Sequence, residues 1–346
     1  MAGKSINELI WNVTEEEYRK DPAISYSTLS RFEREGWRNL AHLYDKIETP
    51  SLTFGSAVDA LITDGEDDFN DRFIVCDFPP LTDSLISIAR YLYSAYGHLY
   101  SKLEDIPSIY INEAADVNGY YKGDKYENFR VKKIKESCGE YYSLLKLAED
   151  KSILSTADYE DVMLCRDELL TNSITSYLFT ESEYPIEKVF QAKFKASYIG
   201  IPVRCMFDEL IINHSAKVIT PIDLKTTGHY EEEFQDSFVK WRYDIQSRLY
   251  TYILNEVINS DPYFKDFTID TYRFCTINRR SKAPLIWEFP LNHAVGDLMS
   301  DSGEILRDWR SILVDLNWYL ENPETKYSKD ALHNEGVLQI NNLKLV

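Results

Sequence analysis

The pattern of apolar and polar positions changes twice along the chain, and it predicts helices at both ends with strands between them. Apolar residues recur at helical spacing in the first half, and we expect helices at about 28–46, 55–64, 84–103, 127–149 and 157–178. Val, Ile and Phe then alternate or run together as in strands, at 184–194, 201–213, 218–227, 269–277 and 284–289. Further helices are expected at 231–259 and 295–321, whereas the tail from about 322 has no assigned structure.

This order of elements predicts an α/β fold. Three strands in succession, then a helix and more strands, indicate a mixed central sheet flanked by helices. The helical stretch at about 81–180 reads as an insertion into that core. Because no linker rich in Pro, Gly or Ser divides the chain, we predict a single domain over residues 1–346.

Composition narrows the function classes. The 346 residues include 57 acidic and 38 basic side chains, so the formal net charge is −19. This balance argues against a general nucleic-acid coat protein, but not against an enzyme whose basic residues line one groove. The apolar runs are shorter than the ~18–20 residues that a membrane span needs, so no membrane partner is expected. Five scattered cysteines without a C-x-x-C motif indicate a reducing cytoplasm.

The candidate chemistry lies on two neighbouring strands. Asp208 stands seven residues before the turn residue Ser215, and Asp223 stands eight residues after it. In an antiparallel hairpin such positions lie nearly opposite each other, about 5 Å apart. Asp223 and Lys225 are two residues apart on one strand and share a face. Two carboxylates and an ammonium group should therefore converge.

Like charges on adjacent strands repel, and such a pair needs a cation between them. Carboxylate oxygens suit Mg²⁺ or Mn²⁺, and a lysine beside that metal could hold or deprotonate a water, or stabilise charge on a phosphate. The alternative is a surface hairpin with an ordinary Asp–Lys pair. On the following helix, Gln246 and Tyr250 are four residues apart and share a face, where they could orient a water or the lysine, or contact a phosphate. An ordinary polar helix border is the alternative for that pair.

The series Asp208, Asp223-Leu224-Lys225 and Gln246-x-x-x-Tyr250 resembles the PD-(D/E)XK nuclease superfamily, in its RecB/RecE/lambda-exonuclease branch. Two upstream segments are similar to that branch as well. They are Ile24-Ser25-Tyr26-Ser27-Thr28-Leu29-Ser30-Arg31-Phe32 and Phe54-Gly55-Ser56-Ala57-Val58-Asp59-Ala60-Leu61. The resemblance covers about residues 24–255, and it implies a restriction-endonuclease-like core.

The resemblance also implies roles for single residues. Asp208 and Asp223 would hold Mg²⁺ or Mn²⁺, Lys225 would position or deprotonate the attacking water, and Gln246 and Tyr250 would support it. Asp59 replaces the histidine that the family usually carries at this position, and we expect its carboxylate to be a further metal ligand. A solvent-exposed helix carboxylate is the alternative.

Glu187 resembles an acidic residue that many relatives carry on the preceding strand, and it is the fourth candidate ligand. A solvated charge at the sheet edge is the alternative for this residue. Relatives with an iron–sulfur cluster carry three cysteines after the Gln-x-x-x-Tyr helix, whereas this chain has only Cys275 there. We therefore expect no cluster.

The resemblance predicts a metal-dependent DNA nuclease, specifically an exonuclease of phage recombination or repair, in the host cytoplasm if phage-encoded. DNA would be its partner, and candidates beyond DNA are a single-strand annealing or recombination protein and a homo-oligomer. The alternative is a non-catalytic DNA-binding or virion-associated protein that retains the fold. Two basic runs, Arg130–Lys135 and Arg279–Lys282, could follow a phosphate backbone or could be solvated surface.

Overall fold

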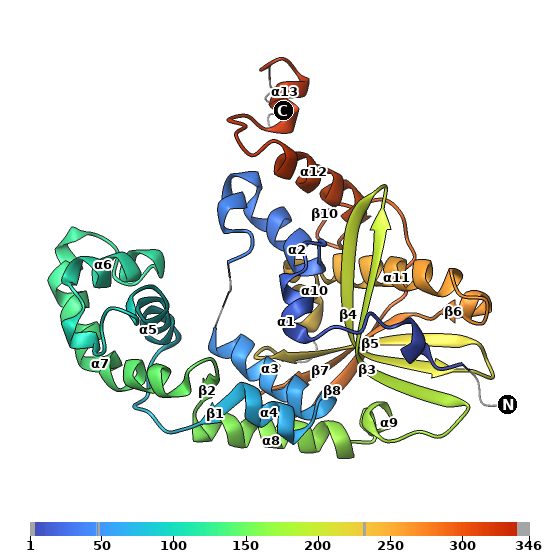
Figure 1. Cartoon of the computed structure of the whole chain (residues 1–346), viewed down its shortest axis with the longest axis horizontal. Helices are drawn as coiled ribbons and strands as arrows, with labels where there is room; N and C mark the ends of the chain where they lie inside the picture. The colour runs from blue at the N-terminus through green and yellow to red at the C-terminus, as the bar shows by residue number, and fades with distance from the viewer. Residues whose placement is uncertain (1–3, 46, 48, 231–232, 338–346) are drawn as a thin grey trace.

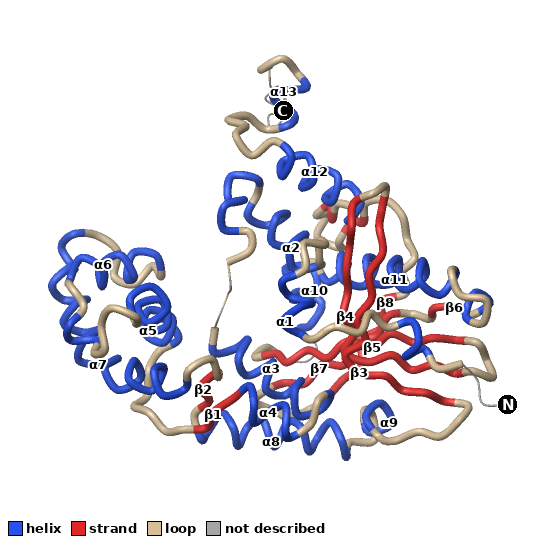
Figure 2. Tube along the Cα trace, viewed as in Figure 1, coloured by secondary structure: helices blue, strands red, loops and turns tan. Residues whose placement is uncertain are grey.

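The computed structural model describes residues 4–45, 47, 49–230 and 233–337. Its centre is a mixed six-stranded sheet (Figure 2). Five strands follow one another across it in the order β3 (Ile186–Tyr198), β4 (Ile201–Asn213), β5 (Val218–Thr227), β7 (Tyr272–Asn278) and β8 (Pro284–Phe289). The short β6 (Thr268–Ile269) pairs with β5. Strands β5 and β7 run parallel, whereas the other neighbours on the main path are antiparallel.

Helices cover both faces of this sheet, as predicted (Figure 1). On one face, α11 (Tyr243–Asn259) packs on β3 and β4, with α2 (Tyr26–Glu35) and α12 (Trp309–Glu321) behind it. On the other face, α3 (Pro50–Thr63) and α8 (Thr156–Thr171) enclose a second core with β5 and β7. The mixed α/β fold with a central sheet flanked by helices is therefore confirmed. Strand residues alternate between the two cores because successive side chains point to opposite faces.

The stretch at 81–180 has two parts. Helices α5 (Asp83–Tyr96), α6 (Ser108–Val117) and α7 (Glu127–Ala148) form a lobe with a hydrophobic core of its own, at the left of Figure 1. Helices α8 and α9 (Ser176–Phe179) then return to the sheet. Strands β1 (Phe73–Val75) and β2 (Ser152–Leu154) pair in parallel, so they tie together the chain on either side of the lobe.

Shorter elements complete the described chain. The helices are α1 (Glu15–Lys20), α4 (Glu66–Arg72), α10 (Phe234–Trp241) and α13 (Lys329–His333). The 3₁₀ turns are η1 (Ile6–Leu9), η2 (Trp37–His42), η3 (Leu103–Asp105), η4 (Asp124–Tyr126) and η6 (Phe264–Asp266), and β9 (Leu298–Met299) pairs with β10 (Ile305–Leu306). Within the described ranges, no helix is both long and apolar enough to span a bilayer.

Several expected helices are wrong in part. The helix expected at 84–103 ends at Tyr96, and that expected at 157–178 is interrupted between α8 and α9. The helix expected at 231–259, whose residues 231–232 lie outside the described ranges, is divided into α10 and α11 at Arg242, which has a φ of +59°. The helix expected at 28–46 ends at Glu35, because Gly36 adopts a φ of +75° that breaks the helix before η2. The helix expected at 295–321 begins only at Trp309, after the β9–β10 pair, where Asp308 accepts a hydrogen bond from the Arg310 N–H as its N-cap.

Candidate functional site

Asp208 and Asp223 lie on adjacent strands of the central sheet. The β4–β5 ladder pairs Glu209 with Ile222, and the next step of this register sets Asp208 across from Asp223. The backbone N–H of Leu224 donates to Asp208 Oδ2 at 2.7 Å, so the side chain replaces the next backbone acceptor. The two strands thus separate where the carboxylates face each other.

Asp223 is held by two side chains from different elements. It is only 1% exposed. Lys225 Nζ lies 2.5 Å from Asp223 Oδ2, and Gln246 Nε2 donates to Asp223 Oδ1 at 2.5 Å. The sheet thus supplies the lysine and α11 supplies the amide. Gln246 and Lys225 therefore fix one orientation of this carboxylate.

Lys225 is a permanently charged group in this arrangement. Burial lowers its pKa, but the charges of Asp223, Tyr243 and Asp208 raise it more, and the net effect is a rise above the ordinary value. Its ammonium group also lies over the Tyr243 ring, 5.0 Å from the centroid. Lys225 is suited to donate hydrogen bonds and to stabilise negative charge, and not to accept a proton.

The helix α11 that carries Gln246 is anchored by two buried arginines. Arg242, with φ +59°, links α10 to α11 and forms an ion pair with Asp244 at 2.9 Å. Arg248 forms an ion pair with Asp308 at 2.5 Å. The two ion pairs thus hold the N-terminal half of α11, the part of the helix that carries Gln246.

Tyr250 lies one turn beyond Gln246 on the same helix. It is buried, and its ring packs on Phe207 of β4 with centroids 5.2 Å apart. Burial raises the pKa of its phenol well above the ordinary value, so the hydroxyl stays protonated. Tyr250 therefore supports the strand that carries Asp208.

Asp59 reaches the same region from α3. Burial, and after it the charge of Asp64, raise the pKa of Asp59 to about 7, against the opposing effect of Arg72. The charge of Asp223 also contributes to this rise. The pKa of Asp208 lies well above its ordinary value, because of burial first and then because of the charges of Asp223 and Asp59. The three aspartates are thus close enough to repel one another.

Gly55 allows α3 to approach β5. A Cβ atom at Gly55 would lie 2.9 Å from Thr226 Oγ1, closer than real Cβ contacts. Asp59 is four residues further along α3 and hence on the same helix face. The glycine of the upstream motif therefore determines how near Asp59 comes to the strand that carries Asp223 and Lys225.

Gln191 is a site residue that the sequence pattern did not single out. It adopts a φ of +49° in β3, across from Asp208, and the β3–β4 ladder skips it. Its Nε2 lies 3.3 Å from Asp59 Oδ2 and donates to Thr63 Oγ1 at 2.9 Å. No local signal marks such a position. Tyr243, in contrast, shares a helix face with Gln246 and could have been found by i, i+3 spacing.

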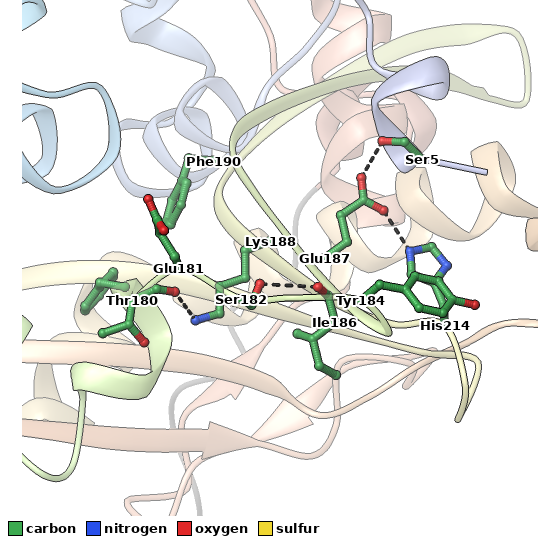
Figure 3. A pocket seen from close by; sticks show the side chains of 11 residues that line it. Ser5, Thr180, Glu181, Ser182, Tyr184, Ile186, Glu187, Lys188, Phe190 and His214 are labelled. Carbon is green, nitrogen blue, oxygen red and sulfur yellow. Dashed lines mark hydrogen bonds and ion pairs between the residues drawn. The ribbon is translucent and has the colours of Figure 1, made fainter. Parts of the chain in front are cut away.

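Glu187 lies elsewhere on β3. It pairs with Ile212, four residues along β4 from Asp208, which is about 13 Å of strand. Its carboxylate accepts hydrogen bonds from the Ser5 hydroxyl and, at 2.9 Å, from His214 Nε2 (Figure 3). These residues line a cavity of about 530 Å³ between the N-terminal segment and the β3–β4 hairpin. The structure thus brings Asp59, Asp208, Asp223, Lys225, Gln246 and Tyr250 together, and it does not bring Glu187 to them.

The donor set suits a partial oxygen site for a hard cation. Asp208 and Asp223 face each other, and burial first, then the neighbouring carboxylates, raise the pKa of Asp208 and of Asp59 in spite of the nearby Lys225. Over the described part of the chain, no group of three or more His, Cys, Asp or Glu side chains forms a complete metal-binding cluster. Two carboxylates completed by water and substrate phosphates are a common set for Mg²⁺.

Comparisons with known proteins add little to this geometry. No protein-family model matches the chain. No curated protein matches it either. Among solved structures, the chain is similar to a crystal structure from Eubacterium rectale that is provisionally named an exonuclease. The identity is 11%, the match covers 96% of each chain and the TM-score is 0.37. A similarity this distant carries no argument about function.

Proposed function

We propose that the chain is a metal-dependent DNA nuclease that hydrolyses phosphodiester bonds, and specifically an exonuclease of phage recombination or repair. The observation that carries the proposal is the buried Asp223 carboxylate, held between Lys225 and Gln246 with Asp208 across from it. A buried acid of this kind costs stability, and such costs gather at functional sites. The exonuclease assignment comes from the motif resemblance alone.

Asp208 and Asp223 would hold Mg²⁺ or Mn²⁺, with Asp59 as a further ligand. The metal would act as a Lewis acid toward a phosphate oxygen and would lower the pKa of a bound water. Glu187 is left out of this set because its carboxylate is engaged by Ser5 and His214. The donors are all oxygen atoms, which favours Mg²⁺ and Mn²⁺ over softer metals.

The chain's own side chains would orient and stabilise the reacting groups. Lys225 stays an ammonium ion, so it would donate to the attacking water or to a phosphate oxygen as negative charge develops there. Gln246 keeps Asp223 from rotating, and the Tyr243 ring limits where the Lys225 head can move. Proton removal from the water would fall to another group, since Lys225 has no free lone pair.

The test is degradation of an end-labelled linear duplex with Mg²⁺ or Mn²⁺ and with a chelator. We expect Asp223→Ala and Lys225→Ala each to lower the rate by about a hundredfold or more, as for loss of one charge-stabilising group. Asp266→Ala is the matched control, because Asp266 forms an exposed ion pair with Lys217 at 3.3 Å. A covalently closed circle that resists cleavage would support an exonuclease.

Rates within twofold of wild type for both site variants would refute the proposal. DNA binding by the wild-type chain without cleavage in either metal would instead favour a non-catalytic DNA-binding or virion-associated protein. Folding of each variant is checked by its melting curve, so that loss of activity is not mistaken for loss of structure.

A further inference from the structure

A hollow of about 260 Å³ lies beside Lys225, between the end of β5, α10 and the start of α11. Hydroxyl and aromatic groups line it together with the lysine. The residues with these groups include Lys225, Thr226, Thr227, Ser237, Trp241 and Tyr243. The hollow therefore combines a cation and hydroxyl donors with flat aromatic rings. These are the groups that hold phosphates and bases.

Trp241 is the exposed ring of this hollow. Its side chain ends α10 and is 41% exposed, although burying an indole is strongly favourable. Its backbone carbonyl is fixed by the Tyr26 hydroxyl at 2.7 Å, so the ring is presented from a held position. An aromatic ring kept in water beside a candidate catalytic lysine needs a reason other than packing.

Two cations lie over the indole ring. Arg34 Cζ lies 5.1 Å and Lys240 Nζ 5.0 Å from the ring of Trp241. Both side chains are exposed, and among the described residues neither forms an ion pair with an acid. Burial raises the pKa of Tyr243, whereas the charges of Lys225 and Arg34 both lower it, so Arg34 and Lys225 both lie near the Tyr243 side chain. Arg34 thus lies near both the Trp241 and the Tyr243 rings of the hollow.

The basic runs that stand out in the sequence are neutralised in part. Arg130 is buried against Asp116 at 2.5 Å, and Lys132 lies 3.8 Å from Glu136. Arg279 forms ion pairs with Asp158 and Asp161, and Lys282 lies 2.8 Å from Asp161. Arg34 and Lys240 differ from these paired residues, because the described part of the chain supplies neither with an acidic partner, although the chain carries a net charge of −19.

We propose that Trp241 stacks a nucleobase of a single-stranded DNA end, and that Arg34 and Lys240 hold the phosphates beside it, next to Lys225. The proposal rests on the proposed function in that it takes DNA as the ligand. Inside a duplex both faces of every base are covered by its neighbours, so the ring can stack only on a base at an end or in an unpaired strand. The flexible Lys240 head is the group that a stacked base would displace from the ring. The substrate class at this site is thus a frayed or single-stranded end.

Binding tests the proposal separately from cleavage. Affinity is measured by fluorescence anisotropy in a chelator, with a short labelled oligothymidylate and with an abasic strand of equal length. We expect Trp241→Ala to weaken binding of the oligothymidylate by about five- to a hundredfold and to leave the abasic strand unchanged. Trp241→Phe should retain most of the affinity because a ring remains.

The cations have a different signature. Arg34→Ala and Lys240→Ala should weaken both strands, and each should reduce the slope of log affinity against log salt by about 0.7. Trp241→Ala should leave that slope unchanged. Phe129→Ala is the matched control, since Phe129 is 50% exposed on α7 far from this hollow in sequence, and it should change neither affinity nor slope.

Three results would overturn the proposal. The first is that Trp241→Ala binds oligothymidylate as tightly as the wild type. The second is that this variant loses the same affinity for the oligothymidylate and for the abasic strand. The third is that folded Trp241→Phe loses as much affinity as folded Trp241→Ala. A wild-type chain that prefers bases through Trp241 but cleaves no DNA with metal would support the stacking site and refute the nuclease. A chain that cleaves DNA but binds it independently of Trp241 would support the nuclease and refute the stacking site.

Discussion

Replacing Asp59 with asparagine should stabilise the metal-free protein, and more so at alkaline pH. Burial first, then Asp64 and Asp223, raise the pKa of Asp59 from 3.8 to about 7, while Arg72 and Lys225 oppose the rise. The folded chain therefore holds this proton more tightly than the unfolded chain. Wild-type stability must then fall as the pH rises from about 4 to about 7, and the cost is complete above that window.

The size of the effect follows from the shift. At about 1.4 kcal/mol per pKa unit, a rise of about three units costs roughly 4 kcal/mol near pH 8 and roughly 1–2 kcal/mol near pH 5. Asparagine has the same shape and carries no charge, and its amide oxygen can still accept from Gln191. We therefore expect Asp59→Asn to raise the free energy of unfolding by at most about 4 kcal/mol near pH 8. The gain should be about 2–3 kcal/mol smaller near pH 5.

The assay is urea unfolding of both proteins in chelator at the two pH values, followed by the same measurement with Mg²⁺. Divalent metal should narrow the difference, because a cation that binds the carboxylates stabilises only the charged wild type. Asp68→Asn serves as control, since Asp68 lies in the first turn of α4 and is exposed. A variant that is less stable than wild type at both pH values, or equally stabilised at both, would refute the electrostatic account of Asp59.

Three further outcomes are expected. Saturating Mg²⁺, at about a hundred times its dissociation constant, should raise the wild-type melting temperature by about 4 °C, and an equal rise in Asp208→Asn would place the metal elsewhere. Gly55→Ala should slow DNA cleavage and destabilise the fold by about 1 kcal/mol, because the new methyl group would collide with Thr226 Oγ1. If that collision is the cause, adding Thr226→Ala should restore the cleavage rate. Glu209 is 1% exposed, and burial raises its pKa to about 8, so the wild-type protein should lose stability as the pH rises from about 4.5 to 8. Glu209→Gln should remove this loss, and Mg²⁺ should not change the result. Unfolding curves with and without Mg²⁺ check this last point.

The strands and their charged pair were predictable because their signals are local. Alternating apolar residues identify β3, β4 and β5, and the length of a hairpin sets the register that opposes Asp208 to Asp223. The two-residue spacing of Asp223 and Lys225 and the four-residue spacing of Gln246 and Tyr250 each define a shared face. These inferences need only the geometry of one element or of one turn.

Which side chains meet across the molecule was decided by tertiary structure alone. Asp59 comes within electrostatic range of Asp223 because Gly55 lets α3 approach Thr226, whereas Glu187 turns to Ser5 and His214. The Arg130–Lys135 run could follow a phosphate backbone as judged from the sequence, but Arg130 pairs with Asp116 in the folded chain, whereas Arg34 and Lys240, without an acidic partner among the described residues, lie over Trp241. Charge and polarity are properties of single residues, but the partner that neutralises a charge comes from whichever distant segment the packing brings beside it.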